Sequence, residues 1–188
     1  MSHKPLVLAP LAVEALAIGR RAGYRVVRTG MGPDKSRRAV RKLAGSGSGA
    51  IAVVGLCGAL DPVLRPGDVF VADEVRGPDG VVVVCAADEV AALCEAAGLK
   101  AVRGALVSTD HIVTGEERTA LFAEGARAVD MESAYLAELA AGRRFAVIRV
   151  VVDTPSRELS SALHTAVGGA RALRVLGRIG AALDHWVN

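Results

Sequence analysis

The chain has 188 residues, of which 52% are hydrophobic and only 3% are aromatic. A chain of this length fits one domain and buries roughly 70% of the surface that its unfolded form exposes. Its core must therefore consist mainly of Ala, Val and Leu, which suits helices packed against a parallel sheet. We expect residues 1–188 to form a single domain.

The charges nearly balance, with 23 basic and 20 acidic residues and a net charge of +3. No basic run carries interleaved aromatic residues, so we expect no nucleic-acid partner. The basic residues of the last predicted helix, Arg171, Arg174 and Arg178, are interpreted as one solvated face.

The cysteines Cys57, Cys85 and Cys94 are unevenly spaced, and the four histidines show no ligand spacing. We therefore predict reduced thiols in the cytoplasm, with no metal site and no cofactor. The apolar run near the N-terminus is too short for a signal peptide. No apolar segment approaches the roughly 20 residues that span a bilayer.

Apolar runs and helix-period stretches alternate along the chain, which predicts an α/β fold. Strands are predicted at residues 6–9, 25–28, 50–54, 69–75, 81–84, 101–107, 128–129 and 145–152. Helices are predicted at residues 11–21, 35–44, 87–97, from about 116, at 134–140, and from 160 or 161 to 183. We read these elements as a three-layer αβα domain around a mixed, mostly parallel sheet.

A short glycine loop, containing Gly30 and Gly32, precedes the second predicted helix. It is not a Walker A loop, because Asp34 stands where the second glycine belongs. It is not a dinucleotide fingerprint either, because Lys35 occupies the third glycine position. Its backbone N–H groups at a helix N-terminus could hold an anion or a polarised oxygen, and an ordinary tight turn is the alternative.

Acidic residues follow two predicted strands near the C-terminus. Each has a structural explanation: Asp130 as a helix N-cap, Glu132 as a charge at the positive end of a helix, and Asp153 as a cap of the next turn. In open α/β sheets, however, ligands bind beyond the carboxyl ends of the strands. We therefore expect these three acids to face one crevice.

The sequence Val-Asp-Met-Glu-Ser at 129–133, followed by Arg-Val-Val-Val-Asp-Thr-Pro at 149–155, resembles the purine nucleoside phosphorylase and nucleosidase superfamily. With Asp-Thr-Pro-Ser-Arg-Glu-Leu at 153–159, it looks most like the hopanoid-associated branch, the adenosylhopane nucleosidases. Residues 55–75 resemble the second signature of the superfamily, a Gly-rich turn followed by Gly-Asp and a strand. The resemblance covers roughly residues 5–160 and implies a nucleoside phosphorylase-like fold and an N-glycosidase.

The resemblance also implies catalytic roles. Asp153 is the acid that protonates purine N7, and burial beside apolar residues is expected to raise its pKa. Glu14 is the general base that orients the attacking water. Glu132 accepts hydrogen bonds from the ribose diol, and Met131 packs on the sugar. Val152 stands where relatives often carry Ser. Asp153 therefore lacks one neighbouring group that could assist it in delivering the proton.

Further substrate-binding residues follow from the Gly-x-Gly loop, the Gly-rich turn and the Ser-x-Asp segment beside the base: Gly30, Gly32, Cys57, Gly58 and Asp110. The neighbouring His111 is read as a solvated or hydrogen-bonded loop residue in preference to a catalytic base.

Phosphorolytic relatives usually place Arg and Ser where this chain has Val53 and Leu56. A phosphate dianion against apolar side chains would be poorly compensated, so we predict water as the nucleophile, unless another cation replaces the missing one. Three hypotheses follow: a nucleosidase on adenosylhopane, an enzyme acting on a small nucleoside such as methylthioadenosine, adenosylhomocysteine or futalosine, or a nucleoside sensor without turnover. We expect a homo-oligomer such as a dimer, with peripheral membrane contact and no spanning segment.

Overall fold

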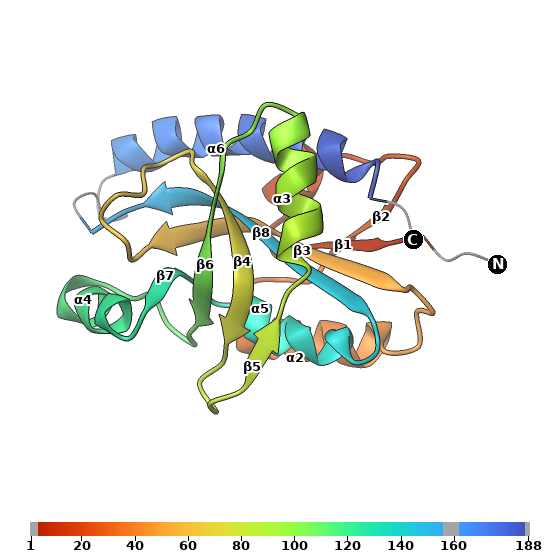
Figure 1. Ribbon diagram of the computed structural model, residues 1–188, viewed down its shortest axis with the longest axis horizontal. Helices are drawn as coiled ribbons and strands as arrows, with labels where there is room; N and C mark the ends of the chain where they lie inside the picture. Colours follow the sequence, from red (N-terminus) through yellow and green to blue (C-terminus); the bar gives the residue numbers. More distant parts are fainter. Residues whose placement is uncertain (1–3, 156–161, 187–188) are drawn as a thin grey trace.

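The computed structural model describes residues 4–155 and 162–186. Helices cover both faces of a mixed sheet, which confirms the predicted three-layer α/β architecture (Figure 1). Residues 156–159 of the branch motif, and the predicted helix start at 160 or 161, lie outside the described residues. None of the helices in the described residues is long and apolar enough to cross a bilayer.

The strands are β1 (Leu6–Ala9), β2 (Arg25–Arg28), β3 (Ala50–Ala59), β4 (Val69–Arg76), β5 (Val82–Val84), β6 (Ala101–Ser108), β7 (Ala126–Asp130) and β8 (Arg144–Asp153). The helices are α1 (Ala12–Ile18), α2 (Pro33–Leu43), α3 (Ala87–Ala96), α4 (Gly115–Ala123), α5 (Ser133–Leu136) and α6 (Ala162–Leu183), with a 3₁₀ turn, η1 (Ala137–Ala140).

The sheet follows the order β2-β1-β3-β7-β6-β4-β5, and β8 pairs with β3 and β4. The pairs β1–β2, β1–β3, β3–β8, β4–β6 and β6–β7 are parallel. The antiparallel pairs are β3–β7, β4–β5 and β4–β8. Because β8 joins β3 to β4 and β7 joins β3 to β6, five of these strands close into a ring.

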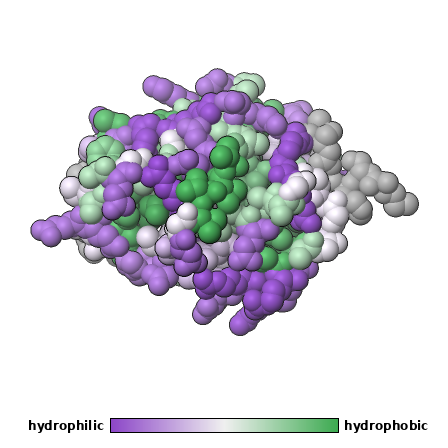
Figure 2. Space-filling model, turned by 60° about the horizontal axis from the view of Figure 1, so that its bottom comes forward, coloured by the Kyte–Doolittle hydropathy of each residue, from purple (hydrophilic) through white to green (hydrophobic). Residues whose placement is uncertain are grey.

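Apolar cores lie on both sides of the sheet. On one side, α1, α3 and α6 pack Ile18, Val90 and Leu176 against apolar strand residues. On the other side, α2, α5 and η1 contribute Val40 and Leu136. The second of these faces presents mostly hydrophilic residues to solvent around smaller hydrophobic patches (Figure 2).

Two predicted elements differ from the structure. The predicted Gly-rich turn after residue 54 is instead the second half of β3, which runs to Ala59 beside β8. The predicted helix at 134–140 is one α-helical turn followed by a 3₁₀ turn. This segment is short, and Gly142, with φ of 68°, turns the chain into β8 before a longer helix can form.

Candidate active site

A cavity of about 360 Å³ opens near the carboxyl ends of β3, β7 and β8. Six of the predicted site residues line it, from four separate segments of the chain: Glu14, Cys57, Gly58, Met131, Glu132 and Asp153. Asp130 lines it as well, so the acids expected to share one crevice do so. The remaining wall is mostly apolar, with Leu11, Met31, Leu56, Ile112, Val113, Val129 and Val152.

Glu14 is buried at the first turn of α1, with 2% of its surface exposed. Its carboxylate accepts hydrogen bonds from the backbone N–H groups of Leu11 (2.6 Å) and Leu56 (2.9 Å). Burial raises the pKa of Glu14, while Arg149 and these two N–H groups act to lower it. A favourable surface charge at a helix end would be exposed, so Glu14 is not one.

Glu132 is also buried, and its Oε1 accepts a hydrogen bond of 2.9 Å from the N–H of Gly32 at the start of α2. The glycine loop therefore holds an anion, but that anion is a side chain of the protein itself. Burial raises the pKa of Glu132 to about 7, against the lowering by Arg149, with Asp130 raising it further. Glu132 is thus a carboxyl that changes charge near neutral pH.

Asp130 accepts hydrogen bonds from the N–H groups of Glu132 (3.2 Å) and Ser133 (3.1 Å). The hydroxyls of Ser108 and Ser133 donate to it at 2.5 Å each. Asp130 was predicted to be the N-cap, but Glu132 occupies that position of α5; Asp130 instead accepts N–H groups at the start of this helix from just before the cap. Its carboxylate also forms an ion pair with Arg149.

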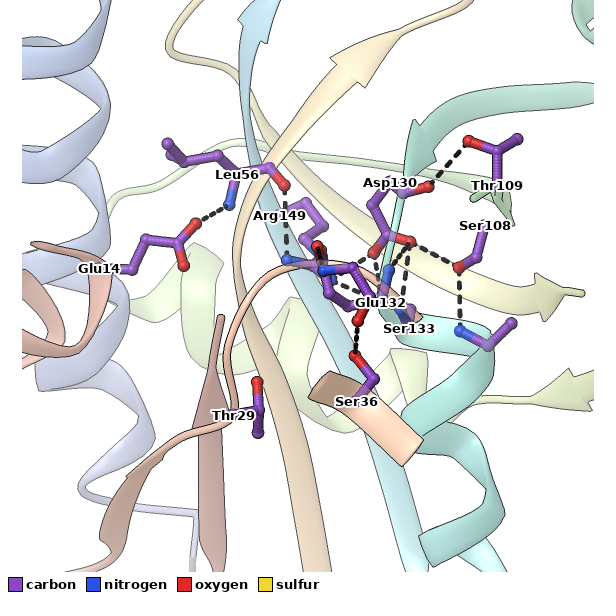
Figure 3. Close-up of polar contacts among 12 residues, drawn as sticks. Glu14, Thr29, Ser36, Leu56, Ser108, Thr109, Asp130, Glu132, Ser133 and Arg149 are labelled. Atoms are coloured by element: carbon purple, nitrogen blue, oxygen red, sulfur yellow. Dashed lines mark hydrogen bonds and ion pairs between the residues drawn. The ribbon is translucent and has the colours of Figure 1, made fainter. Parts of the chain in front are cut away.

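Arg149 lies in the middle of β8 and has no exposed surface (Figure 3). Its guanidinium pairs with Asp130, lies 3.6 Å from Glu132 Oε2, and donates to the hydroxyl of Ser133 at 2.9 Å. Burial acts to lower the pKa of Arg149, but Asp130, Glu132 and Glu14 outweigh burial and raise it. Arg149 therefore stays charged and offsets part of the negative charge beneath the cavity.

Asp153 ends β8 with 3% of its surface exposed, and it forms an ion pair with Arg118 of α4, itself 2% exposed. The expectation of a neutral carboxyl rested on the apolar residues before Asp153. A buried guanidinium in direct contact instead favours the ionised carboxylate. Asp153 is therefore a partner of Arg118 and not an isolated acid.

The glycines of β3 make room for these charged side chains. A Cβ atom at Gly55 would lie 2.6 Å from Arg149 Nη1 and 2.8 Å from Glu14 Oε1. A Cβ atom at Gly58 would lie 2.8 Å from Asp153 Oδ1. These glycines therefore let buried ionic side chains approach the strand closely.

Other predicted binding residues lie apart from the cavity. Asp110 is exposed and hydrogen-bonds to His111 Nδ1 at 2.7 Å, while Glu117 contacts Nε2 of the same ring at 2.9 Å. Hydrogen bonds to Asp110 and Glu117 raise the pKa of His111, which also lines the cavity mouth. Gly30 and Gly32 do not line the cavity, although Met31 between them does.

Cys57 contributes an apolar wall, because burial raises the pKa of its thiol far above neutrality. Val53, one of the two positions where phosphorolytic relatives usually carry a phosphate-binding residue, is fully buried and does not line the cavity. Within residues 4–155 and 162–186, no three His, Cys, Asp or Glu side chains are grouped to hold a metal ion.

A family model described as the phosphorylase superfamily matches residues 17–178. This span includes β3, the acids at the end of β7, and all of β8. The chain belongs to the phosphorylase superfamily. Among curated proteins, none matches the chain.

Solved structures from bacteria share the superfamily fold over nearly their whole length. A putative 5′-methylthioadenosine/S-adenosylhomocysteine nucleosidase from Borrelia burgdorferi, bound to adenine, has a TM-score of 0.84 at 16% identity, covering 97% of this chain and 100% of its own. A mutant Helicobacter pylori nucleosidase with 5′-methylthioadenosine in its active site has a TM-score of 0.82 at 16% identity, covering 98% and 99%. The Helicobacter pylori futalosine hydrolase has a TM-score of 0.81 at 16% identity, covering 97% of each chain. At this identity the likeness establishes the fold.

Sequence reasoning did not identify Arg149 and Arg118 as site residues of this superfamily member. A signal for Arg149 was present, because a single charge inside an apolar strand must find buried partners. No comparable signal marks Arg118, which lies in a short polar helix among exposed acids. Only the packing of α4 against the strands brings it to Asp153.

Proposed function

We propose that the protein hydrolyses the N-glycosidic bond of a 5′-substituted adenosine and releases adenine. The observation that carries this proposal is the meeting of Glu14, Glu132 and Asp153 in one cavity, although they lie far apart in the sequence. Each has the chemistry that one part of the reaction requires. Retention of all three argues against a sensor that binds a nucleoside without turning it over.

In the proposed reaction the C1′–N9 bond breaks, its electron pair moves to adenine, and positive charge develops on the ribose. Asp153 delivers a proton to purine N7, which makes adenine a better leaving group. Glu132 accepts hydrogen bonds from the ribose diol, and Met131 packs against the sugar. Glu14 takes the proton of the water that attacks C1′, and the buried carboxylates stabilise the cationic transition state.

Water is the proposed nucleophile. Leu56 presents an apolar side chain to the cavity, and Lys35 and Arg37, the cations that could replace a phosphate-binding residue, are exposed and do not line it. The cavity does contain Arg118, but this guanidinium is engaged with Asp153. Adenine release should therefore proceed at the same rate with and without inorganic phosphate. Strict phosphate dependence, with ribose 1-phosphate as product, would show that phosphate attacks.

The proposed 5′ group is large and apolar, as in adenosylhopane, a precursor in hopanoid biosynthesis. The apolar wall supports this, and so do Met31 and Ile112, which line the cavity yet are 52% and 64% exposed. Exposed apolar residues at the mouth could contact the lipid-like group and the membrane that carries it. The second candidate is a small soluble nucleoside, favoured by the methylthioadenosine and futalosine enzymes that share the fold.

One assay separates these candidates. Adenine release is measured from adenosylhopane in detergent micelles and from methylthioadenosine, adenosylhomocysteine and futalosine in solution, at matched concentrations. We expect the highest kcat/KM for adenosylhopane. A clear preference for a small nucleoside would reject the hopanoid substrate, and no adenine release from any of them would reject the nucleosidase proposal.

A further inference from the structure

The buried contact between Arg118 and Asp153 requires an explanation that the proposed reaction does not give. A general acid must carry a proton, whereas an adjacent guanidinium favours the carboxylate that has lost it. Both side chains are almost fully buried, so solvent screens their interaction little.

Arg118 is held in place from several directions. Its Nε donates to the carbonyl of Val113 at 3.1 Å, and its Nη1 donates to the carbonyl of Ala59 at 2.8 Å. Its Nη2 reaches Asp153 Oδ2. A guanidinium anchored by two backbone carbonyls presents its third nitrogen in a fixed direction.

The same contact orients the carboxylate. Oδ2 of Asp153 faces Arg118, while Oδ1 lies against the backbone of Gly58, where an added Cβ atom would approach it to 2.8 Å. Gly58 and Asp153 both line the cavity. Asp153 therefore lies between Arg118 of α4 and the backbone of β3. Contact on both sides fixes the orientation of its carboxylate beside the cavity.

We propose that Arg118 is a positioning residue that orients Asp153 for the purine and keeps it ionised until a nucleoside is bound. This inference rests on the proposed function, in which Asp153 is the acid. Asp153 then takes up a proton from solvent water in the nucleoside complex and passes it to N7 as the C1′–N9 electron pair moves to adenine. The water that attacks C1′ gives its proton to Glu14, so one proton enters and one leaves in each turnover.

Other charged and titratable groups surround the Arg118–Asp153 pair, and the Arg118 variants leave these residues unsubstituted. They come from α1, the end of β7, β8, β3 and the loop before α4: Glu14, Asp130, Glu132, Arg149, Cys57 and His111. Arg118 differs from them because its charge contacts Asp153 directly. Its removal should therefore change the titration of Asp153 more than that of the other acids.

The first test needs no turnover. Asp153 is followed by carbon NMR of protein labelled at the aspartate carboxyl carbons, and Asp153→Asn identifies its signal. In the wild-type protein we expect titration below the usual aspartate range, which lies near pH 4. In Arg118→Gln the midpoint should rise by about 1 to 3 pH units, as expected when an adjacent opposite charge is removed. A wild-type Asp153 that titrates above the usual range would overturn the proposal, even if Arg118→Gln fails to fold.

The second test uses the pH dependence of kcat, whose alkaline limb reports the acid in the substrate complex. Arg118→Gln should move this limb to higher pH, while Arg118→Lys, which keeps the charge, should leave it in place and lower kcat. Glu116→Gln, an exposed residue of α4 two positions from Arg118, is the matched control and should change neither. Equal loss of activity by Arg118→Gln at every pH would mean that Arg118 has a structural role only.

If the NMR result holds but no nucleoside is cleaved, the proposed function fails and the placement of Asp153 by Arg118 stands.

Discussion

Glu132 provides the sharpest quantitative prediction, because burial raises its pKa from an ordinary value of 4.5 to about 7. The ionised carboxylate accepts hydrogen bonds from both hydroxyls of a ribose more strongly than the protonated acid, which keeps only part of its acceptor capacity. At pH 5, two units below this pKa, about one molecule in 100 carries the ionised form. The dissociation constant of a ribonucleoside should therefore be higher at pH 5 than at pH 8, by up to about 100-fold.

Calorimetry with a 5′-substituted 7-deazaadenosine measures this effect cleanly. The ligand lacks N7, so its binding makes no demand on the proton of Asp153. The matched 2′,3′-dideoxy ligand should bind with little dependence on pH, and Glu132→Gln should remove the dependence for the ribose ligand. If Glu132→Gln keeps a midpoint near pH 7, another group is responsible and Glu132 is only a helix-end charge.

The same pKa makes a prediction about folding, with a defined sign. Because the folded-state pKa lies above the unfolded one, the stability from Glu132 is complete below pH 4.5 and is lost as pH rises through 7. Between pH 5 and pH 8 this loss amounts to about 2 to 3 kcal/mol. In urea unfolding, the free energy of unfolding of Glu132→Gln should rise relative to that of wild type by about this amount between pH 5 and pH 8. If the unfolding free energies of the two proteins change in parallel with pH, the prediction is wrong.

Three further predictions concern the same site. Asp153→Asn should lower adenine release by about 10² to 10⁴-fold with the fold intact by circular dichroism, and near-normal turnover would remove Asp153 from the mechanism. Arg149→Met should lower the free energy of unfolding by about 3 to 5 kcal/mol in urea titrations, because it leaves buried carboxylates without their cation; a loss below about 1 kcal/mol would contradict this. Gly55→Ala should also destabilise, because its Cβ would meet Arg149 and Glu14, whereas Gly45→Ala, where a Cβ meets open space, is the control and should be close to neutral.

The sequence predicted the α/β class, the layers and most strands of this protein, because these follow from local patterns. A buried strand such as β8 is a continuous apolar run, and a glycine such as Gly142 ends a helical segment wherever it occurs. The motifs at the ends of β7 and β8 likewise indicated Glu132 and Asp153. The resemblance to the superfamily indicated Glu14, and all three acids line the cavity.

Only the tertiary structure decided which charges meet. β3 continues past its glycines because β8 pairs with it along its length, a non-local contact that no local pattern encodes. The burial of Glu132 against Arg149, and the contact of Asp153 with Arg118 of α4, depend on elements distant in sequence. Burial and neighbouring charge set the ionisation of a carboxyl, and both are properties of the packed chain. The sequence therefore indicated the acids of the site, and the fold determined their charge states.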